Sequence, residues 1–175
     1  MNASVTTKVY VIITLLVALW CAGIVAAPVL KHTGLQSSTD VVYRFFSRVC
    51  HQDDVRSFHL EGEKFGVCIR CSAIYFGFLA GLLLMPLFGV LKRSTLPKRT
   101  LMIAVIIPML VDAVLSVAGV HASTTLTRVA TGLLFGGVMP WFIVPFLAEA
   151  CSLLIDKKKI QSPDPGVSNY VRKAQ

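Results

Sequence analysis

The stretch FGVCIRCSAIYFGFLAGLLLMPLFGVL, from Phe65 to Leu91, combines a strong membrane signal with the most chemically specific motif of the chain. It is long enough to cross a bilayer core of about 30 Å, which takes about 20 residues of helix. Cys68-Ile69-Arg70-Cys71 lies near its start, and Gly77 and Gly81 have the spacing that lets membrane helices pack closely. The stretch therefore predicts a transmembrane helix with thiols at one end.

Three further apolar runs lie on either side of this stretch, at residues 9–30, 101–120 and 129–155. The chain is 55% hydrophobic and only 15% charged, with a mean hydropathy of +0.71, which excludes an ordinary soluble domain. The first run is longer than the core of a secretory signal peptide, so we expect it to stay as a helix. We predict an all-α fold, a four-helix transmembrane bundle with helices at 9–30, 65–91, 101–120 and 129–155, as a single domain over residues 1–160.

Basic residues at the ends of the apolar runs predict the orientation in the membrane. The short linker Lys92–Arg99 carries four positive charges and no acid, and Lys157, Lys158 and Lys159 follow the last run. Because Lys and Arg are enriched on the cytoplasmic side, both termini are expected there, with residues 31–64 outside a prokaryotic cell membrane. Residues 161–175 contain Pro and Gly and are expected to be a disordered cytoplasmic tail.

The same charge distribution bears on the partners of the protein. A net charge of +8 would suit a protein that binds nucleic acid, but cations at the ends of membrane helices interact with anionic lipid headgroups instead. We therefore expect the lipid bilayer as partner and no nucleic acid, and leave a membrane-protein partner or a second copy open.

Within the predicted outer segment, residues 31–64, one stretch has the pattern of a short amphipathic helix. Residues 37–40 are good N-cap residues, and the apolar positions that follow recur at helical spacing: Val41, Val42, Phe45, Phe46 and Val49. Such a helix would rest on the membrane interface and carry Cys50-His51 at its end.

Three cysteines and a histidine on that side predict a metal site. Cys50, Cys68 and Cys71 with His51 or His59 would supply four ligands of the type that zinc prefers in a tetrahedral site. His59 is an alternative to His51 because neighbouring side chains do not easily face one ion. Such a site, holding zinc, would have a structural or partner-binding role.

Two other interpretations of the thiols stay open. Cys68 and Cys71 can cycle between dithiol and disulfide with Cys50 as the exchanging thiol, which would make the protein a membrane thiol-disulfide oxidoreductase. Alternatively, the thiols form one structural disulfide and Asp112 belongs to a proton or solute path.

Asp112 is the second unusual feature, because an acid this deep in a membrane helix is costly unless it faces protein or water. Its candidate partners are Arg70 and Arg128, near the outer ends of their helices. We assign these three residues, together with Tyr75, to an intramembrane polar cluster.

With these residues in place, the sequence resembles a family of small prokaryotic multi-pass membrane proteins known as a domain of unknown function. The resemblance spans Cys50 to Gly136, and Ala73 and Ala113 depart from the family's pattern. It rests on an ordered set of motifs: Cys50-His51-Gln52, Arg56-Ser57-Phe58, Gly62, Cys68-Ile69-Arg70-Cys71, Ile74-Tyr75-Phe76-Gly77, Pro108 with Asp112, and Arg128 followed by Thr131-Gly132. The family implies no reaction, but it points to the same candidate site.

The orientation is testable by labelling intact cells with a membrane-impermeant thiol reagent. A cysteine introduced at Glu61 should be labelled above the background of the parent chain, because residues 31–64 are expected outside. A cysteine introduced at Ser94 should be labelled only after the membrane is permeabilised. The reverse pattern would show that the orientation is inverted.

Overall fold

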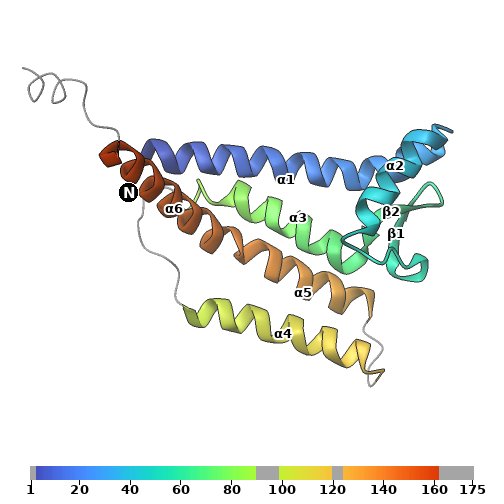
Figure 1. The fold of residues 1–175 in the computed structure, drawn as a ribbon. Coiled ribbons are helices and arrows are strands. Elements are labelled where there is room, and N and C mark those ends of the chain that lie inside the picture. The colour runs from blue at the N-terminus through green and yellow to red at the C-terminus, as the bar shows by residue number, and fades with distance from the viewer. Residues whose placement is uncertain (1–2, 90–98, 120–123, 162–175) are drawn as a thin grey trace, which may run out of the picture.

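The computed structural model describes residues 3–89, 99–119 and 124–161, and most of this part of the chain is helical (Figure 1). The helices and strands follow one another as α1 (Ala3–His32), α2 (Gln36–Ser47), the 3-10 turn η1 (Asp54–Arg56), β1 (Ser57–Leu60), β2 (Glu63–Cys68), α3 (Ile69–Leu84), α4 (Arg99–Val117), α5 (Thr125–Val138) and α6 (Pro140–Gln161). Strands β1 and β2 pair antiparallel in a two-stranded sheet. We call the end of the molecule that carries α2 and this sheet the hairpin end.

In the part of the chain that the structure describes, three stretches are long and apolar enough to cross a membrane. They are α1 from Ser4 to His32, all of α4, and the consecutive helices α5 and α6 from Thr125 to Ile155. Helix α3 is also apolar, but its 16 residues would span about 24 Å, which is less than the hydrocarbon core. Three of the four predicted membrane helices thus correspond to candidate spans, and a four-helix transmembrane bundle stays a prediction.

The sequence prediction for residues 65–91 needs correction at its start. Helix α3 begins at Ile69, because residues 63–68 form strand β2 and pair with β1. The all-α prediction is therefore wrong in this one segment, where a small sheet replaces loop and helix. Apolar character alone did not separate the strand from the helix that follows it.

A tight turn makes this hairpin possible. Leu60 pairs with Glu63, so Glu61 and Gly62 alone form the turn, with φ angles of 52° and 81°. Two-residue hairpin turns of this handedness match the natural twist of the strands, and glycine adopts positive φ without steric cost. The turn fixes the register in which His59 lies opposite Lys64, and an irregularity between Ser57 and His59 then shifts the pairing so that Ser57 lies opposite Cys68.

The predicted helix at 129–155 is two consecutive helices that meet at Met139. Helix α5 starts earlier than predicted, at Thr125, where the Thr124 hydroxyl caps it by accepting from the Thr127 backbone N–H at 3.3 Å. Pro140 begins α6, and proline has no backbone N–H to continue the hydrogen-bond ladder of the preceding turn. The chain therefore continues in helical form, with its hydrogen bonding interrupted at the junction.

The amphipathic helix is present as α2, but its start differs from the prediction. It begins at Gln36, with Leu35 as N-cap and no side-chain capping bond. The Thr39 hydroxyl instead donates to the Leu35 carbonyl at 3.0 Å from inside the first turn. Helix α2 ends at Ser47, so Cys50 and His51 lie in the segment that follows the helix.

Helices α3 and α5 pack closely because glycines replace side chains at their contact. A Cβ atom at Gly77 would lie 2.8 Å from the Leu133 carbonyl oxygen, and one at Gly81 would collide with the Gly137 carbonyl. From the other side, a Cβ at Gly136 would collide with the Ile74 carbonyl. Small residues at such positions let two backbones approach directly, which strengthens van der Waals contact in a membrane.

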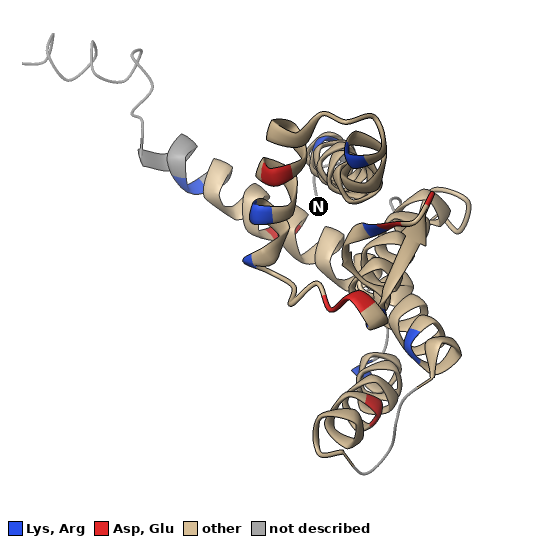
Figure 2. Cartoon of the chain, turned by 90° about the vertical axis from the view of Figure 1, so that its right-hand side faces the viewer, with Lys and Arg blue, Asp and Glu red and all other residues tan. Residues whose placement is uncertain are grey.

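The remaining helices are arranged around this pair (Figure 1). Helix α1 runs alongside α3 and reaches α6, the hairpin and α2. Helix α4 lies beside α5, away from α1, in both Figure 1 and Figure 2, and none of its residues is buried. Figure 2 looks onto the hairpin end, where charged residues are carried by α2 and the segment around the sheet.

Buried apolar side chains form two clusters along α1. The cluster near the hairpin end contains Ile24, Phe46, Cys50 and Val67, and aromatic side chains including Trp20 pack against it. The second cluster, of Leu82, Met85 and Val144, lies between α1, α3 and α6. The first cluster directly adjoins the candidate site.

Several sequence predictions concern segments outside the described residues. They are residues 92–98 of the basic linker, residues 90–91 and 120 at the ends of two predicted helices, and residues 162–175 of the predicted tail. The structure therefore leaves the predicted orientation, which rests largely on the basic linker, as a prediction.

The tight α3–α5 contact makes Gly81 a critical position. Gly81→Val should lower the melting temperature in detergent, because overpacking a close backbone contact costs about 1–3 kcal/mol and here the colliding atoms belong to the backbone. Ala80→Val is the matched control, since Ala80 is exposed on the same helix. Equal melting temperatures for both variants would contradict the role of the glycine contact.

Candidate metal centre

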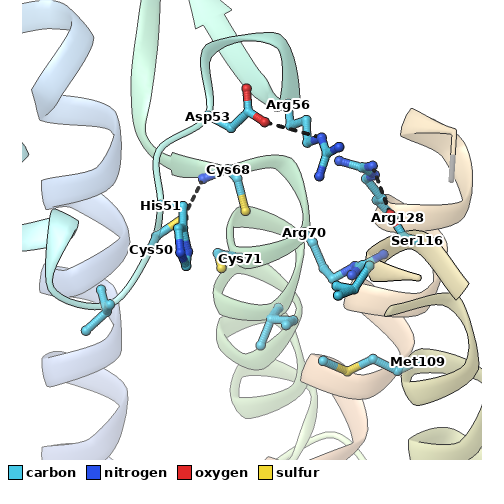
Figure 3. Close-up of a pocket in the computed structure, with 13 residues that line it drawn as sticks. Cys50, His51, Asp53, Arg56, Cys68, Arg70, Cys71, Met109, Ser116 and Arg128 are labelled. Carbon is cyan, nitrogen blue, oxygen red and sulfur yellow. Dashed lines mark hydrogen bonds and ion pairs between the residues drawn. The ribbon is translucent and has the colours of Figure 1, made fainter. Parts of the chain in front are cut away.

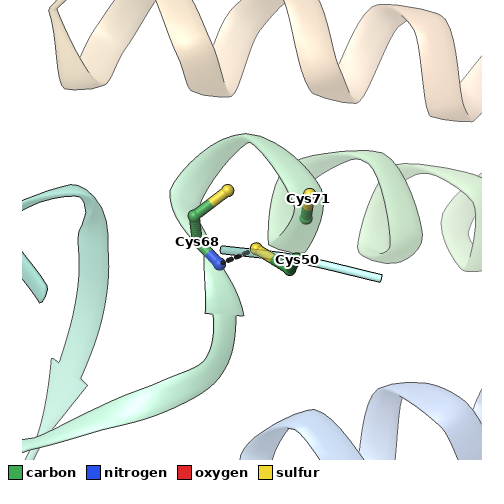
Figure 4. Close-up of side chains that lie close together, drawn as sticks. All are labelled: Cys50, Cys68 and Cys71. Atoms are coloured by element: carbon green, nitrogen blue, oxygen red, sulfur yellow. Dashed lines mark hydrogen bonds between the residues drawn. The ribbon is translucent and has the colours of Figure 1, made fainter. Parts of the chain in front are cut away.

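Three cysteine sulfurs from separate segments meet at the hairpin end. Cys50 follows α2, Cys68 is the last residue of β2, and Cys71 lies in the first turn of α3. The three sulfur atoms lie within 4.8 Å of one another (Figure 4). Cys50 therefore joins the neighbouring pair Cys68 and Cys71, 18 and 21 residues further along the chain, in one compact thiol cluster.

The change from strand to helix positions Cys68 and Cys71. Cys68 has extended backbone angles, φ −67° and ψ 164°, and is the N-cap of α3. The apolar run at 65–91 predicts both thiols of the Cys-x-x-Cys motif inside a helix. The structure places Cys68 one residue before the helix, yet its sulfur still lies within 4.8 Å of the sulfurs of Cys50 and Cys71 (Figure 4).

The apolar core of the hairpin end holds Cys50 in place. Its backbone N–H donates to the Phe46 carbonyl at 3.0 Å, and only 8% of the residue is exposed. Trp20 packs edge-to-face on Phe46 with ring centroids 5.2 Å apart. The aromatic side chains therefore fix the backbone from which the thiol projects.

Hydrogen bonds favour the ionised form of Cys50. Its sulfur accepts from the backbone N–H of Cys68 at 3.2 Å and of Gln52 at 3.5 Å. Contacts from the Cys68 thiol, and next from the Cys71 thiol, are the main causes that hold the pKa of Cys50 below that of an ordinary thiol, against the effect of burial. Thiolate is the form that binds metal or attacks a disulfide.

Gln52 joins the segments around the thiol cluster. Its side-chain amide donates to the Tyr43 carbonyl at 2.9 Å and to the Gly66 carbonyl at 2.7 Å, which links α2 to β2. Its own carbonyl accepts from the Lys64 ammonium at 3.0 Å, and its backbone has a positive φ of 51°. Gln52 belongs to the Cys50-His51-Gln52 motif, but its role depends on a backbone conformation that the sequence does not reveal.

The two candidate histidines do not join the three sulfurs. Among the residues that the structure describes, no histidine nitrogen or carboxylate oxygen completes the group within 4.8 Å. His51 lines the cavity next to Cys50, whereas His59 lies on β1 with its Nε2 3.5 Å from an Asp54 oxygen. The predicted histidine ligand thus stays a prediction.

The predicted polar cluster is divided between two places. Arg70 forms an ion pair with Asp112, and both side chains are mostly buried, with 19% and 11% exposed. Arg128 donates to the Ser116 hydroxyl at 3.5 Å. Tyr75 lies elsewhere, packed against Trp20 with ring centroids 5.5 Å apart, on the side of α3 that faces α1.

A cavity of about 520 Å³ connects the thiol cluster with this charged region (Figure 3). Its lining includes all three cysteines, His51, and three arginines, which are Arg56, Arg70 and Arg128. The thiol cluster is therefore accessible from a space large enough for a small molecule.

Comparisons with known proteins place the chain in a family. The family described as "Predicted membrane protein (DUF2085)" matches residues 50–142, which is more than half of the chain and includes all three clustered cysteines with Arg70, Asp112 and Arg128. The chain belongs to the DUF2085 family.

Two archaeal relatives of this DUF2085 protein carry the description "uncharacterized". One, from Methanocaldococcus jannaschii, is 31% identical over 147 residues, covering 81% of this chain and 94% of the relative. The other, from Methanothermobacter thermautotrophicus, is 32% identical over 88 residues, covering 50% of this chain and 78% of the relative. No solved structure matches the chain.

The buried Arg70–Asp112 ion pair of this DUF2085 protein leads to a testable prediction. Asp112→Ala should destabilise the protein by about 3–5 kcal/mol, because it leaves the Arg70 guanidinium buried opposite an alanine. Thermal unfolding in detergent measures the loss. Replacing both residues by leucine should recover much of it, since an apolar pair of similar volume leaves no buried charge.

Asp54→Ala is the control for this prediction, because the Asp54 side chain is 71% exposed and should tolerate the change. Equal stability of Asp112→Ala and the parent chain would show that the ion pair is not structural. Asp112 would then be a candidate for proton or ion handling.

Proposed function

We propose that the protein binds one metal ion, zinc, through Cys50, Cys68 and Cys71. The observation that supports this is the convergence of three sulfurs within 4.8 Å from three separate segments. Three thiolates around Zn²⁺ at about 2.3 Å would be about 3.8 Å apart in a tetrahedral site, so small side-chain adjustments are enough to reach that geometry.

The electrostatic environment of Cys50 supports the same proposal. Metal binding requires deprotonated thiols, and hydrogen bonds from Cys68 and Cys71 already hold the pKa of Cys50 below its usual range. The buried position of Cys50 also excludes most competing solvent from one side of the site.

The metal would join the segments of the hairpin end to the membrane helices. Cys50 is attached to α2, Cys68 to the sheet and Cys71 to α3, so one ion would tie all three together. Following the predicted orientation, this end lies on the outer face of the cell membrane. A site of this kind would stabilise an outer surface on which a lipid or a membrane-protein partner can bind.

The fourth coordination position distinguishes a structural site from a reactive one. Closed four-ligand zinc sites are structural, whereas sites with three protein ligands keep a position open for water or substrate. Since three sulfurs form the group and the cavity adjoins them, we propose an open fourth position facing the cavity. A rotation of His51, which lines the same cavity, would instead close the site.

Thiol-disulfide exchange is the second candidate, and the lowered pKa of Cys50 favours it. Joining Cys68 and Cys71 forms one S–S bond and releases two protons and two electrons to an acceptor. In a membrane protein that acceptor would be a lipid-soluble electron carrier. Cys50 would be the exchanging thiol, which attacks the Cys68–Cys71 disulfide and forms a mixed disulfide with one of its sulfurs.

Metal analysis of the anaerobically purified protein tests the proposal. We expect about one zinc ion per chain, and its loss in Cys68→Ser, which removes one thiolate ligand. Cys151→Ser should keep the metal, because Cys151 lies on α6 and does not belong to the cluster.

Mass-spectrometric mapping of the thiols in the same samples separates the alternatives. A metal-free protein with a Cys68–Cys71 disulfide that forms and opens reversibly would overturn the metal proposal in favour of redox exchange. A metal-free protein with an inert disulfide would leave the cluster a structural role only.

A further inference from the structure

We propose that the cavity beside the thiol cluster binds an oxyanion, a carboxylate or a phosphate, between Arg56 and Arg128. This deepens the proposed function, because the bound molecule would face the thiol centre. The binding itself rests on the arginines and stands without a metal.

Three arginines from three separate elements line one cavity of about 520 Å³. Arg56 comes from η1, Arg70 from the first turn of α3, and Arg128 from the first turn of α5. Guanidinium groups repel one another, so their convergence on a shared space costs free energy unless a negative charge joins them.

The charges that line the cavity favour an anion. Asp53 is the one carboxylate that lines it, and it lies 3.3 Å from the Arg56 Nε in an exposed ion pair. Asp112 neutralises Arg70 from the side of α4. Among the described residues, the lining itself therefore carries three guanidinium groups and one carboxylate.

The arrangement of the groups indicates how a ligand would lie. In Figure 3 the Arg56 and Arg128 side chains lie across the cavity from the three cysteines. An oxyanion held by these guanidiniums would accept charge-assisted hydrogen bonds, for which the planar guanidinium is well suited. The rest of the bound ligand would then extend toward the three cysteine sulfurs.

Apolar side chains complete the lining and indicate an amphiphilic ligand. Ile74 of α3, with Met109 and Val117 of α4, lines the same cavity. A molecule with an oxyanion at one end and an apolar body would satisfy both parts. The same headgroup chemistry occurs in an anionic lipid and in a free small oxyanion, and the experiment separates these two sources.

The test uses the full-length protein in a neutral detergent with two probes. Inorganic phosphate is titrated by calorimetry, and native mass spectrometry compares bound phosphatidylglycerol with bound phosphatidylcholine. We expect saturable binding of phosphate or a preference for phosphatidylglycerol. Arg56→Gln and Arg128→Gln should each weaken it about tenfold or more, as expected for losing a charged hydrogen-bond donor.

Arg44→Gln is the matched control, because Arg44 is an exposed arginine on α2 that does not line the cavity. It should bind both probes as the parent does. If Arg128→Gln fails to fold, Arg56→Gln decides the test, since the Arg56 side chain is 54% exposed and its loss leaves no buried charge.

Each outcome has one meaning for this site. Saturable phosphate binding that needs Arg56 supports a free oxyanion, and phosphatidylglycerol binding alone with the same dependence supports a lipid headgroup. The proposal is overturned if neither probe binds saturably, or if Arg44→Gln weakens binding as much as Arg56→Gln. A metal-free protein that binds phosphate would overturn the metal proposal alone, and a zinc-containing protein that binds neither probe would overturn this one alone.

Discussion

The close contact between α3 and α5 is the constraint on which the rest of the structure depends. Gly77, Gly81 and Gly136 bring two backbones together without intervening side chains. Within a bilayer, such contacts replace the hydrophobic effect as the source of helix association, because lipid solvates apolar side chains as well as protein does. This contact fixes the first turns of α3 and α5, and therefore the positions of Arg70 and Arg128 beside one cavity.

The thiol cluster depends on a second constraint, the change from strand to helix at Cys68. The hairpin brings Cys68 to the start of α3, and the aromatic core around Phe46 brings Cys50 to the same point. Gln52 then links the two sides through its amide hydrogen bonds. Since Cys68 and Cys71 are neighbours in the chain, the Cys-x-x-Cys spacing brings those two sulfurs together, and tertiary packing adds Cys50 to them.

A buried ion pair lies beside the thiol cluster in this protein. The Arg70–Asp112 pair crosses from α3 to α4, which otherwise packs on α5, and so it helps to hold an exposed helix in place. The same arginine lines the cavity next to Cys71. A buried ion pair is tolerated where each charge is matched, and here it also sets the electrostatic environment of the candidate site.

The sequence by itself predicted a membrane protein with four apolar runs, three of which correspond to candidate spans in the structure, and it showed which residue types carry the chemistry. These features follow from hydropathy, from segment length and from the side chains themselves. Only the tertiary structure decided that residues 63–68 form a strand, that Tyr75 lies against Trp20 instead of Asp112, and that no histidine among the described residues joins the three sulfurs. The strand depends on pairing across the Glu61-Gly62 turn and on packing against α1, and the other two depend on contacts between segments distant in the chain, which local sequence patterns do not encode.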